Sequence, residues 1–233
     1  MDIKNVRSSL NFSYKPRSLF IFLIALSCCH FSNAALVAIN EIHYDNAGSD
    51  IGEAVELVGI AGTDLSNWSL VLYNGSDNLD YRTIDLTGAA ANNDNGFSFW
   101  HIPISSFQNG PNDGIALVDQ TDSVIEFLSY EGVINAAGGV ANGLTSIDIG
   151  VAEGSTTLVG MSLQRIGEIR VLNGQISFLD DAWEANSESW AAANINQQFA
   201  QAVPIPGSIG LLFSAIGILF SYKMRNGKAN QNH

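Results

Sequence analysis

Cysteine is almost absent from this sequence of 233 residues, and its two cysteines lie side by side near the start. Cys28 and Cys29 both fall in the N-terminal apolar stretch. If that stretch is removed, the remaining chain has no thiol, which excludes disulfides and the cysteine-ligated type of zinc site. A domain of about 165 residues can bury a sufficient core without disulfides.

Positive charge is equally scarce in the middle of the chain. Between positions 41 and 188 there are 22 acidic residues and only three basic ones, Arg82, Arg165 and Arg170, which leaves a net charge of −19. Affinity for nucleic acids comes largely from Lys and Arg that displace counterions from phosphates. We therefore expect no direct nucleic-acid binding, and a surface that attracts divalent cations.

The middle of the chain also lacks helical periodicity, and short strands separated by turn signals take its place. Asn-Gly or Asp-Gly pairs at 74–75, 95–96, 109–110 and 113–114 favour hairpin turns. Many short strands at such spacing are typical of a β-sandwich or barrel. The segment 132–160 is small and polar, and we interpret it as a long surface loop. The predicted strands are 36–44, 53–58, 68–73, 79–86, 96–102, 114–119, 124–130, 160–166 and 175–183.

The N-terminal residues 1–34 have the features of a secretory signal. A basic region precedes the apolar run 19–26, and Ser32-Asn33-Ala34 places small residues at the −3 and −1 positions of a cleavage site. The apolar run is shorter than the roughly 20 residues that span a bilayer, which favours cleavage. A retained anchor helix and a lipoprotein-type cleavage before Cys28 are the alternatives.

The C-terminal residues 203–228 form a separate segment. A proline-containing break at 203–207 precedes the uncharged run 209–222, and Lys223, Arg225 and Lys228 follow. At 1.5 Å per residue the run would reach about 21 Å as a helix, whereas a hydrocarbon core is about 30 Å thick. We expect a marginal membrane segment at 209–222 with its basic end toward the cytoplasm.

Four short motifs occur in the order typical of one family. They are INEI at 39–42, EAVEL at 53–57, DLSNWSL at 64–70 and DGIALVD at 113–119. Together they make residues 36–199 resemble a lamin-tail domain, whose pattern is an N-E-I strand, an E-x-V-E-L strand, an L-S-G-W-x-L strand and a later hairpin. Ala54 and Asn67 depart from that pattern. The resemblance implies an all-β, immunoglobulin-like β-sandwich.

The tail, in turn, resembles a PEP-CTERM sorting signal: a proline-containing motif, an apolar helix and a basic end. In that family an exosortase-type membrane peptidase processes the protein near the motif. The motif here, VPIP at 203–206, lacks the family's glutamate, so a plain membrane anchor is the alternative. Either interpretation implies an exported protein at the cell membrane or the cell surface of a bacterium.

The candidate metal site is a turn rich in oxygen ligands. Asp45, Asp50 and Glu53 crowd one glycine-containing turn, and hard cations such as calcium take several carboxylate and carbonyl oxygens. No D-x-D-x-D-G loop fixes the spacing. The structural interpretation is that Asn40, Glu41 and Glu56 tie loops and neighbouring strands together instead. Strict alternation would place Val37, Ile39, Glu41 and His43 on one face of the first strand.

Catalytic signatures are missing. Residues 35–202 contain two histidines, His43 and His101, and no G-x-S-x-G elbow. Trp68, Phe97, Phe99 and Trp100 at strand spacing are expected in the core rather than on a sugar-binding platform. We therefore expect a non-enzymatic, anchored domain that mediates binding or adhesion to a surface protein or polysaccharide. The alternative is a substrate- or partner-binding module for an extracellular nuclease or phosphatase acting in trans.

Overall fold

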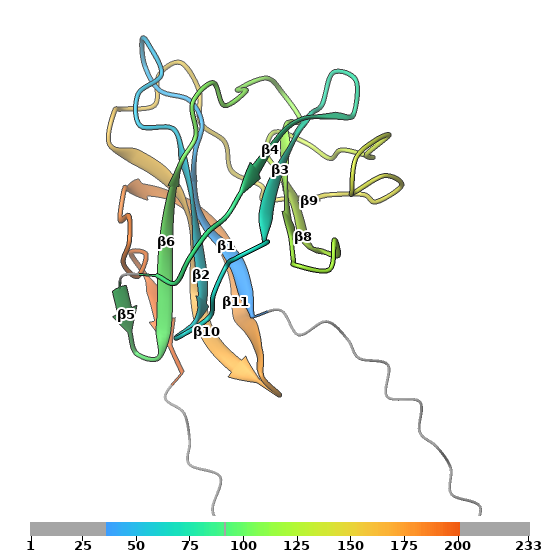
Figure 1. The fold of residues 1–233 in the computed structure, drawn as a ribbon. Helices are drawn as coiled ribbons and strands as arrows, with labels where there is room; N and C mark the ends of the chain where they lie inside the picture. The colour runs from blue at the N-terminus through green and yellow to red at the C-terminus, as the bar shows by residue number, and fades with distance from the viewer. Residues whose placement is uncertain (1–35, 91, 201–233) are drawn as a thin grey trace, which may run out of the picture. The chain divides into compact units, whose positions relative to one another are not determined.

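The computed structural model describes residues 36–90 and 92–200, which fold into two β-sheets without a helix (Figure 1). This confirms the predicted all-β, sandwich-like class. No helix among these residues is long and apolar enough to cross a membrane. The secretory-signal interpretation of 1–34 and the membrane-segment interpretation of 203–228 lie outside the described residues.

The first sheet has seven strands in the order β11-β10-β1-β2-β6-β5, with β12 beside β10. Its pairs are antiparallel except β10 with β12. β12 pairs with the part of β10 that lies beyond its contacts with β1. The strands are β1 Val37–His43, β2 Ala54–Ile60, β5 Asn92–Asp94, β6 Phe97–Pro103, β10 Met161–Leu172, β11 Gln175–Ser187 and β12 Gln197–Phe199.

The second sheet has five strands in the order β4-β3-β7-β8-β9. Each of the nine predicted strands has a counterpart in the two sheets, whereas β5, β9 and β12 were not predicted. Those three have only two or three residues each, too few for an alternating pattern to be recognised. The strands are β3 Ser69–Asn74, β4 Leu79–Asp85, β7 Gly114–Val118, β8 Val124–Ser129 and β9 Ile147–Asp148.

The main hydrophobic core lies between the two sheets. Buried side chains of β1 and β2, such as Ile39 and Leu57, belong to the same cluster as Leu70, Leu72 and Leu117 of the second sheet. Inward-facing residues of two stacked sheets form such a core in β-sandwiches. The four aromatic residues expected in the interior are buried, as predicted: Trp68, Phe97, Phe99 and Trp100.

A β-bulge in β1 changes which of its side chains share a face. The pairing of β1 with β2 shifts register between Ile39 and Glu41, so that Asn40 is an extra residue. Such a bulge reverses the side-chain alternation beyond it. Val37, Ile39, Ile42 and Tyr44 therefore join the inner core, and Glu41 contacts polar residues away from it. The prediction that Val37, Ile39, Glu41 and His43 share one face was wrong for this reason.

Both sheets also carry apolar clusters on their outer faces. On the second sheet, Tyr73 and Phe127 pack against Ile134 and Ala141 of the segment after β8. The interpretation of 132–160 as a surface loop was therefore wrong in part, since buried residues of this segment cover the sheet. On the first sheet, Phe97 and neighbouring apolar residues pack against partly buried residues of the C-terminal segment 188–200.

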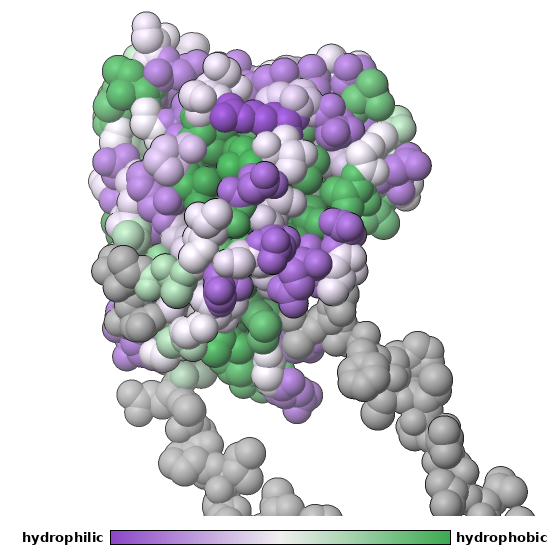
Figure 2. Space-filling view, in the orientation of Figure 1, coloured by the Kyte–Doolittle hydropathy of each residue, from purple (hydrophilic) through white to green (hydrophobic). Residues whose placement is uncertain are grey.

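Figure 2 shows one face of this arrangement, in which apolar residues are visible between more polar ones. The upper edge of that view, where the turn after β3 and the loop between β6 and β7 lie in Figure 1, is coloured mostly hydrophilic or neutral. Polar loops at one end of a sandwich are where such folds commonly bind ligands, because a rigid scaffold positions them.

Gly59 provides a test of the core packing. A Cβ built on Gly59 would lie 2.7 Å from Trp100 Cζ3 and 2.8 Å from Cη2, so the indole ring occupies the space of a side chain. We predict that Gly59→Ala lowers the free energy of unfolding by about 1–3 kcal/mol, the usual cost of overpacking. Urea unfolding measures this change. Gly154→Ala is the matched control, because nothing lies within 4 Å of its Cβ; equal losses in both variants would contradict the packing argument.

Candidate functional site

The predicted calcium ligands are only partly brought together. Partial burial raises the pKa of Asp45, and the charge of nearby Asp50 raises it further. Asp50 also accepts a hydrogen bond from Asn109 Nδ2 at 3.3 Å. Glu53 instead accepts a hydrogen bond from Phe107 N at 3.4 Å. No group of three His, Cys, Asp or Glu side chains in the described ranges could share one metal ion, and calcium binding here stays a prediction.

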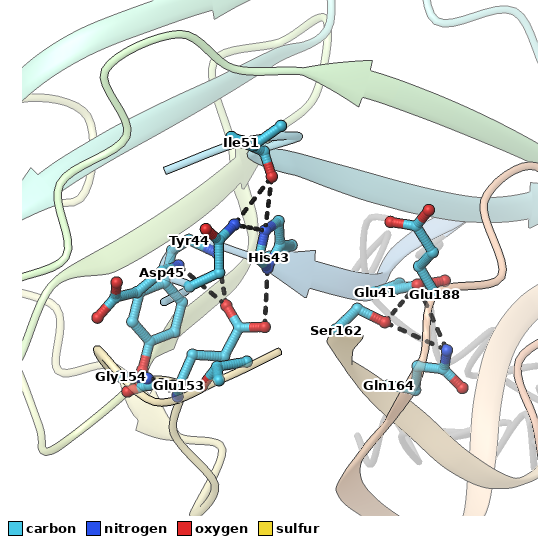
Figure 3. Close-up of polar contacts among 12 residues, drawn as sticks. Glu41, His43, Tyr44, Asp45, Ile51, Glu153, Gly154, Ser162, Gln164 and Glu188 are labelled. Carbon is cyan, nitrogen blue, oxygen red and sulfur yellow. Dashed lines mark hydrogen bonds and ion pairs between the residues drawn. The ribbon is translucent and has the colours of Figure 1, made fainter. Parts of the chain in front are cut away.

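A buried histidine–glutamate pair lies directly beside that turn. His43 Nδ1 is 2.9 Å from Glu153 Oε1, and both side chains are about 1% exposed (Figure 3). The other ring nitrogen lies 3.1 Å from Ile51 O. Burial alone would lower the pKa of His43, but the hydrogen bond to Glu153 and its charge outweigh burial and raise it. His43, at the end of β1, is thus held by Glu153 on one side and by the backbone of Ile51 in the β1–β2 turn on the other.

Glu153 also closes the end of β1. Its Oε2 accepts hydrogen bonds from Tyr44 N at 2.7 Å and Asp45 N at 3.1 Å. Tyr44 OH in turn accepts from Glu153 N at 2.7 Å, and its ring stacks on Tyr130 with centroids 3.8 Å apart. The carboxylate thus supplies acceptors for backbone groups that no strand partner satisfies, which is a structural role.

A second buried polar network surrounds Glu41, on the right of Figure 3. Glu41 accepts hydrogen bonds from Ser162 Oγ at 2.5 Å, from Ser189 N at 2.9 Å and from Ser189 Oγ at 2.9 Å. Gln164 Nε2 also donates a hydrogen bond to Glu41 Oε1, at 3.4 Å. Glu41 is wholly buried, and burial raises its pKa despite these hydrogen bonds.

Glu56 is the cross-strand partner of Glu41 and has no exposed surface. It accepts a hydrogen bond from Asn40 Nδ2 at 2.9 Å and another from Ala191 N. Burial, with a further contribution from the charge of Glu41, raises the pKa of Glu56 to about 8. The two glutamates thus hold residues 188–197, which we call the C-terminal strap, against the first sheet. The structural interpretation of Glu41 and Glu56 is confirmed.

Arg165 is the buried cation of the described chain. It donates to both oxygens of Asp181 at 2.7 Å, to Glu126 Oε1 at 2.6 Å and to Ile39 O at 3.1 Å. Its guanidinium also lies 3.8 Å above the ring centroid of Phe178. Burial alone would lower the pKa of Arg165, but the two carboxylates raise it. The side chain therefore links β10 and β11 to β8 of the other sheet.

A broad surface hollow lies at the loop end of the described domain. The turn at 74–76 and the loop segment 106–113 line this groove of about 670 Å³, which we call the loop groove. Buried Asp113 joins its two walls, because its oxygens accept from Gly75 N at 2.8 Å and Gly110 N at 3.0 Å. Tyr81 OH accepts from Gln108 N at 3.1 Å, and Tyr130 OH donates to Gln108 O at 2.6 Å.

These features leave only weak signals in the sequence. Asp113 stands out there only as part of an Asp-Gly turn and of the DGIALVD motif, neither of which points to a groove, and neither Glu153 nor the strap carries a motif. Their partners are far away along the chain: Glu153 lies 110 positions from His43, and Ser189 lies 148 positions from Glu41. A local pattern cannot reveal such pairs. An isolated Glu within the small, polar segment 132–160 is the one hint that the sequence contains.

Comparison with known proteins adds no relative to this picture. No protein-family model matches the chain, and no curated protein and no solved structure matches it either. The lamin-tail and PEP-CTERM resemblances therefore stay predictions that rest on the motifs.

Glu153 should be essential to the stability of the domain. We predict that Glu153→Ala lowers the free energy of unfolding by about 3–5 kcal/mol, because it leaves buried His43 and two backbone amides without their acceptor. Urea unfolding measures the loss, and hydrogen exchange should show faster exchange of the Tyr44 and Asp45 amides. Asp85→Ala, at an exposed site on β4, should change stability by less than about 0.5 kcal/mol. Unchanged protection of both amides would refute the assigned role.

Glu56 should make the domain less stable as pH rises. Its pKa is higher in the folded chain than its ordinary value of 4.5, so the folded chain binds the proton more tightly than the unfolded chain. The stabilising contribution is fully present below pH 4.5 and is lost as pH rises through about 8. The raised pKa values of Glu41 and His43 act in the same direction.

We therefore predict that the melting temperature falls between about pH 5 and pH 8, and that Glu56→Gln makes this fall shallower. Thermal melts across this pH range test the prediction. Asp85→Asn removes an exposed carboxylate of β4. Its melting temperature should fall with pH as steeply as that of the unmodified chain. A profile equally steep in Glu56→Gln would show that another group is responsible.

Proposed function

We propose that this chain is a non-enzymatic, exported domain that is anchored to the membrane or cell surface and mediates binding or adhesion. The observation that carries the proposal is the contrast between two sets of polar residues. Glu41, His43, Glu56 and Glu153 are buried and bonded to the chain itself. The polar side chains of the loop groove, by contrast, line an open hollow of the surface, and the hydrogen bonds of Asp113 hold its two walls together.

The finer fold assignment, an immunoglobulin-like sandwich of the lamin-tail type, belongs to this proposal. The chain passes between the sheets after β2, β4, β6 and β9, which is the kind of crossing found in Greek-key sandwiches. The two motif strands that carry Glu41 and Glu56 lie next to each other in the first sheet. These features support the resemblance, which rests on the motifs.

The proposed location depends on the two ends of the sequence. Residues 1–34 would direct export, and 203–228 would either anchor the protein through 209–222 or be processed by an exosortase-type peptidase. The net charge of −19 between positions 41 and 188 favours partners other than nucleic acids. An accessory role beside a nuclease or phosphatase is the second candidate, and attachment of cells distinguishes the two.

The test compares the full chain with a version that ends at residue 202. In a bacterial host, cell fractionation should place the full chain in the membrane or surface fraction and the shortened chain in the medium or periplasm. Intact mass should show loss of residues 1–34. Cells that carry the full chain should attach to polysaccharide- or protein-coated surfaces better than cells that carry the shortened chain.

Two results would contradict the proposal. A full chain that stays in the cytoplasm with residues 1–34 attached would refute the export. Hydrolysis of DNA or of a phosphomonoester by the purified chain would refute the non-enzymatic role. Stimulation of an added extracellular nuclease, without attachment of cells, would favour the accessory module instead.

A further inference from the structure

The loop groove has an unusual chemical lining for so acidic a domain. Eleven residues of the described chain line it, and Asp113 is the one ionisable residue among them. Asp113 is only 2% exposed, and its two oxygens are occupied by Gly75 N and Gly110 N. The groove therefore presents no free charge, although the middle of the chain carries 22 carboxylates.

Amide and hydroxyl side chains supply the chemistry of the groove. Four amide and two hydroxyl side chains line it: Asn74, Gln108, Asn109, Asn112, Ser76 and Ser106. Within the described chain, the side chains of Ser76, Ser106, Gln108 and Asn112 make no hydrogen bond to another residue. Amides and hydroxyls can both donate and accept, so they suit a ligand whose groups also do both.

The groove is held in shape before any ligand arrives. The backbone of Gln108 is bonded on both sides, by Tyr81 OH at its N–H and by Tyr130 OH at its carbonyl. Asp113 ties the turn at 74–76 to the loop segment 106–113. Preorganised walls reduce the entropy cost of binding, because loops need not become ordered when a ligand binds.

We propose that the loop groove binds an uncharged carbohydrate, with the free amides and hydroxyls bonding to its hydroxyl groups. This inference rests on the proposed binding function and names the ligand class. Hydroxyl groups of a neutral sugar donate and accept at once, which matches the lining. Burial raises the pKa of Asp113, and the negative charges of Glu131 and Asp77 raise it further. These two carboxylates therefore lie near the groove, where they would repel an anionic polysaccharide.

The experiment is calorimetry with the purified full chain in a mild, uncharged detergent. The probes are uncharged malto-, cello- and manno-oligosaccharides, with oligogalacturonate as the anionic probe and a chitosan oligomer as the cationic one. At least one uncharged probe should bind, with an affinity that is the same at low and high salt, because no charge is paired. Binding of charged probes alone, weakened by salt, would overturn the proposal.

Variants then place the binding in the groove. Ser76 is exposed, so Ser76→Trp should obstruct the groove without disturbing the core, and should abolish binding. The double variant Ser76→Ala with Gln108→Ala should weaken binding about tenfold or more, which is about 1.4 kcal/mol. The matched control, Ser155→Ala with Gln198→Ala, removes the same groups at exposed sites elsewhere and should bind normally. Thermal melts confirm that each variant is folded.

The outcomes separate this inference from the proposed function. If no uncharged probe binds, or if Ser76→Trp and the double variant bind as the unmodified chain does, the carbohydrate assignment is wrong. Should cells that carry the full chain still attach to protein-coated surfaces in that case, the binding function stands with a protein partner. If attachment of cells also fails, the proposed function fails as well.

Discussion

The burial of two neighbouring carboxylates is the constraint on which much of this structure depends. Glu41 and Glu56 face each other across β1 and β2 with no exposed surface. Buried carboxylates without hydrogen-bond donors would cost several kcal/mol, so the fold has to bring donors to them. Ser189 and Ala191 of the C-terminal strap supply half of the hydrogen bonds to these two carboxylates, and the strap leads into β12 and Phe199, which cover the apolar outer face of the first sheet.

Some of the acidic residues are thus explained by ion pairs within the domain, whereas the exposed ones make its surface negative. Arg165 neutralises two carboxylates, Glu126 and Asp181, where the sheets meet, and Glu153 is paired with His43. Breaking a buried pair such as His43–Glu153 is costly, although an apolar replacement of the whole pair can be neutral. The specific geometry of each pair, rather than a general excess of charge, is therefore what these residues contribute to the fold.

The nine longer strands could be predicted from the sequence, whereas the three short strands, the faces and the sites could not. Alternation over five or more residues located β1, β2, β7 and their neighbours, because the pattern is local. The bulge at Asn40 and the register shift at Gly167 leave no such trace, yet each reverses the alternation. The partners of His43, Glu41 and Gly75 depend on tertiary contacts, so Glu153, the strap and Asp113 emerged only from the structure.

The same long-range contacts explain why an acid-rich sequence can have a neutral groove. A carboxylate at the wall of a groove would ordinarily dominate its chemistry, but Asp113 is turned inward and bonded to two backbone amides. The other polar side chains on the walls are amides and hydroxyls, beside the apolar Phe107 and Pro111. The acidic surface around it repels anions and holds cations loosely. On the proposed binding role, selectivity in the groove would depend on hydrogen-bond geometry, which walls held by hydrogen bonds maintain and a mobile loop would not.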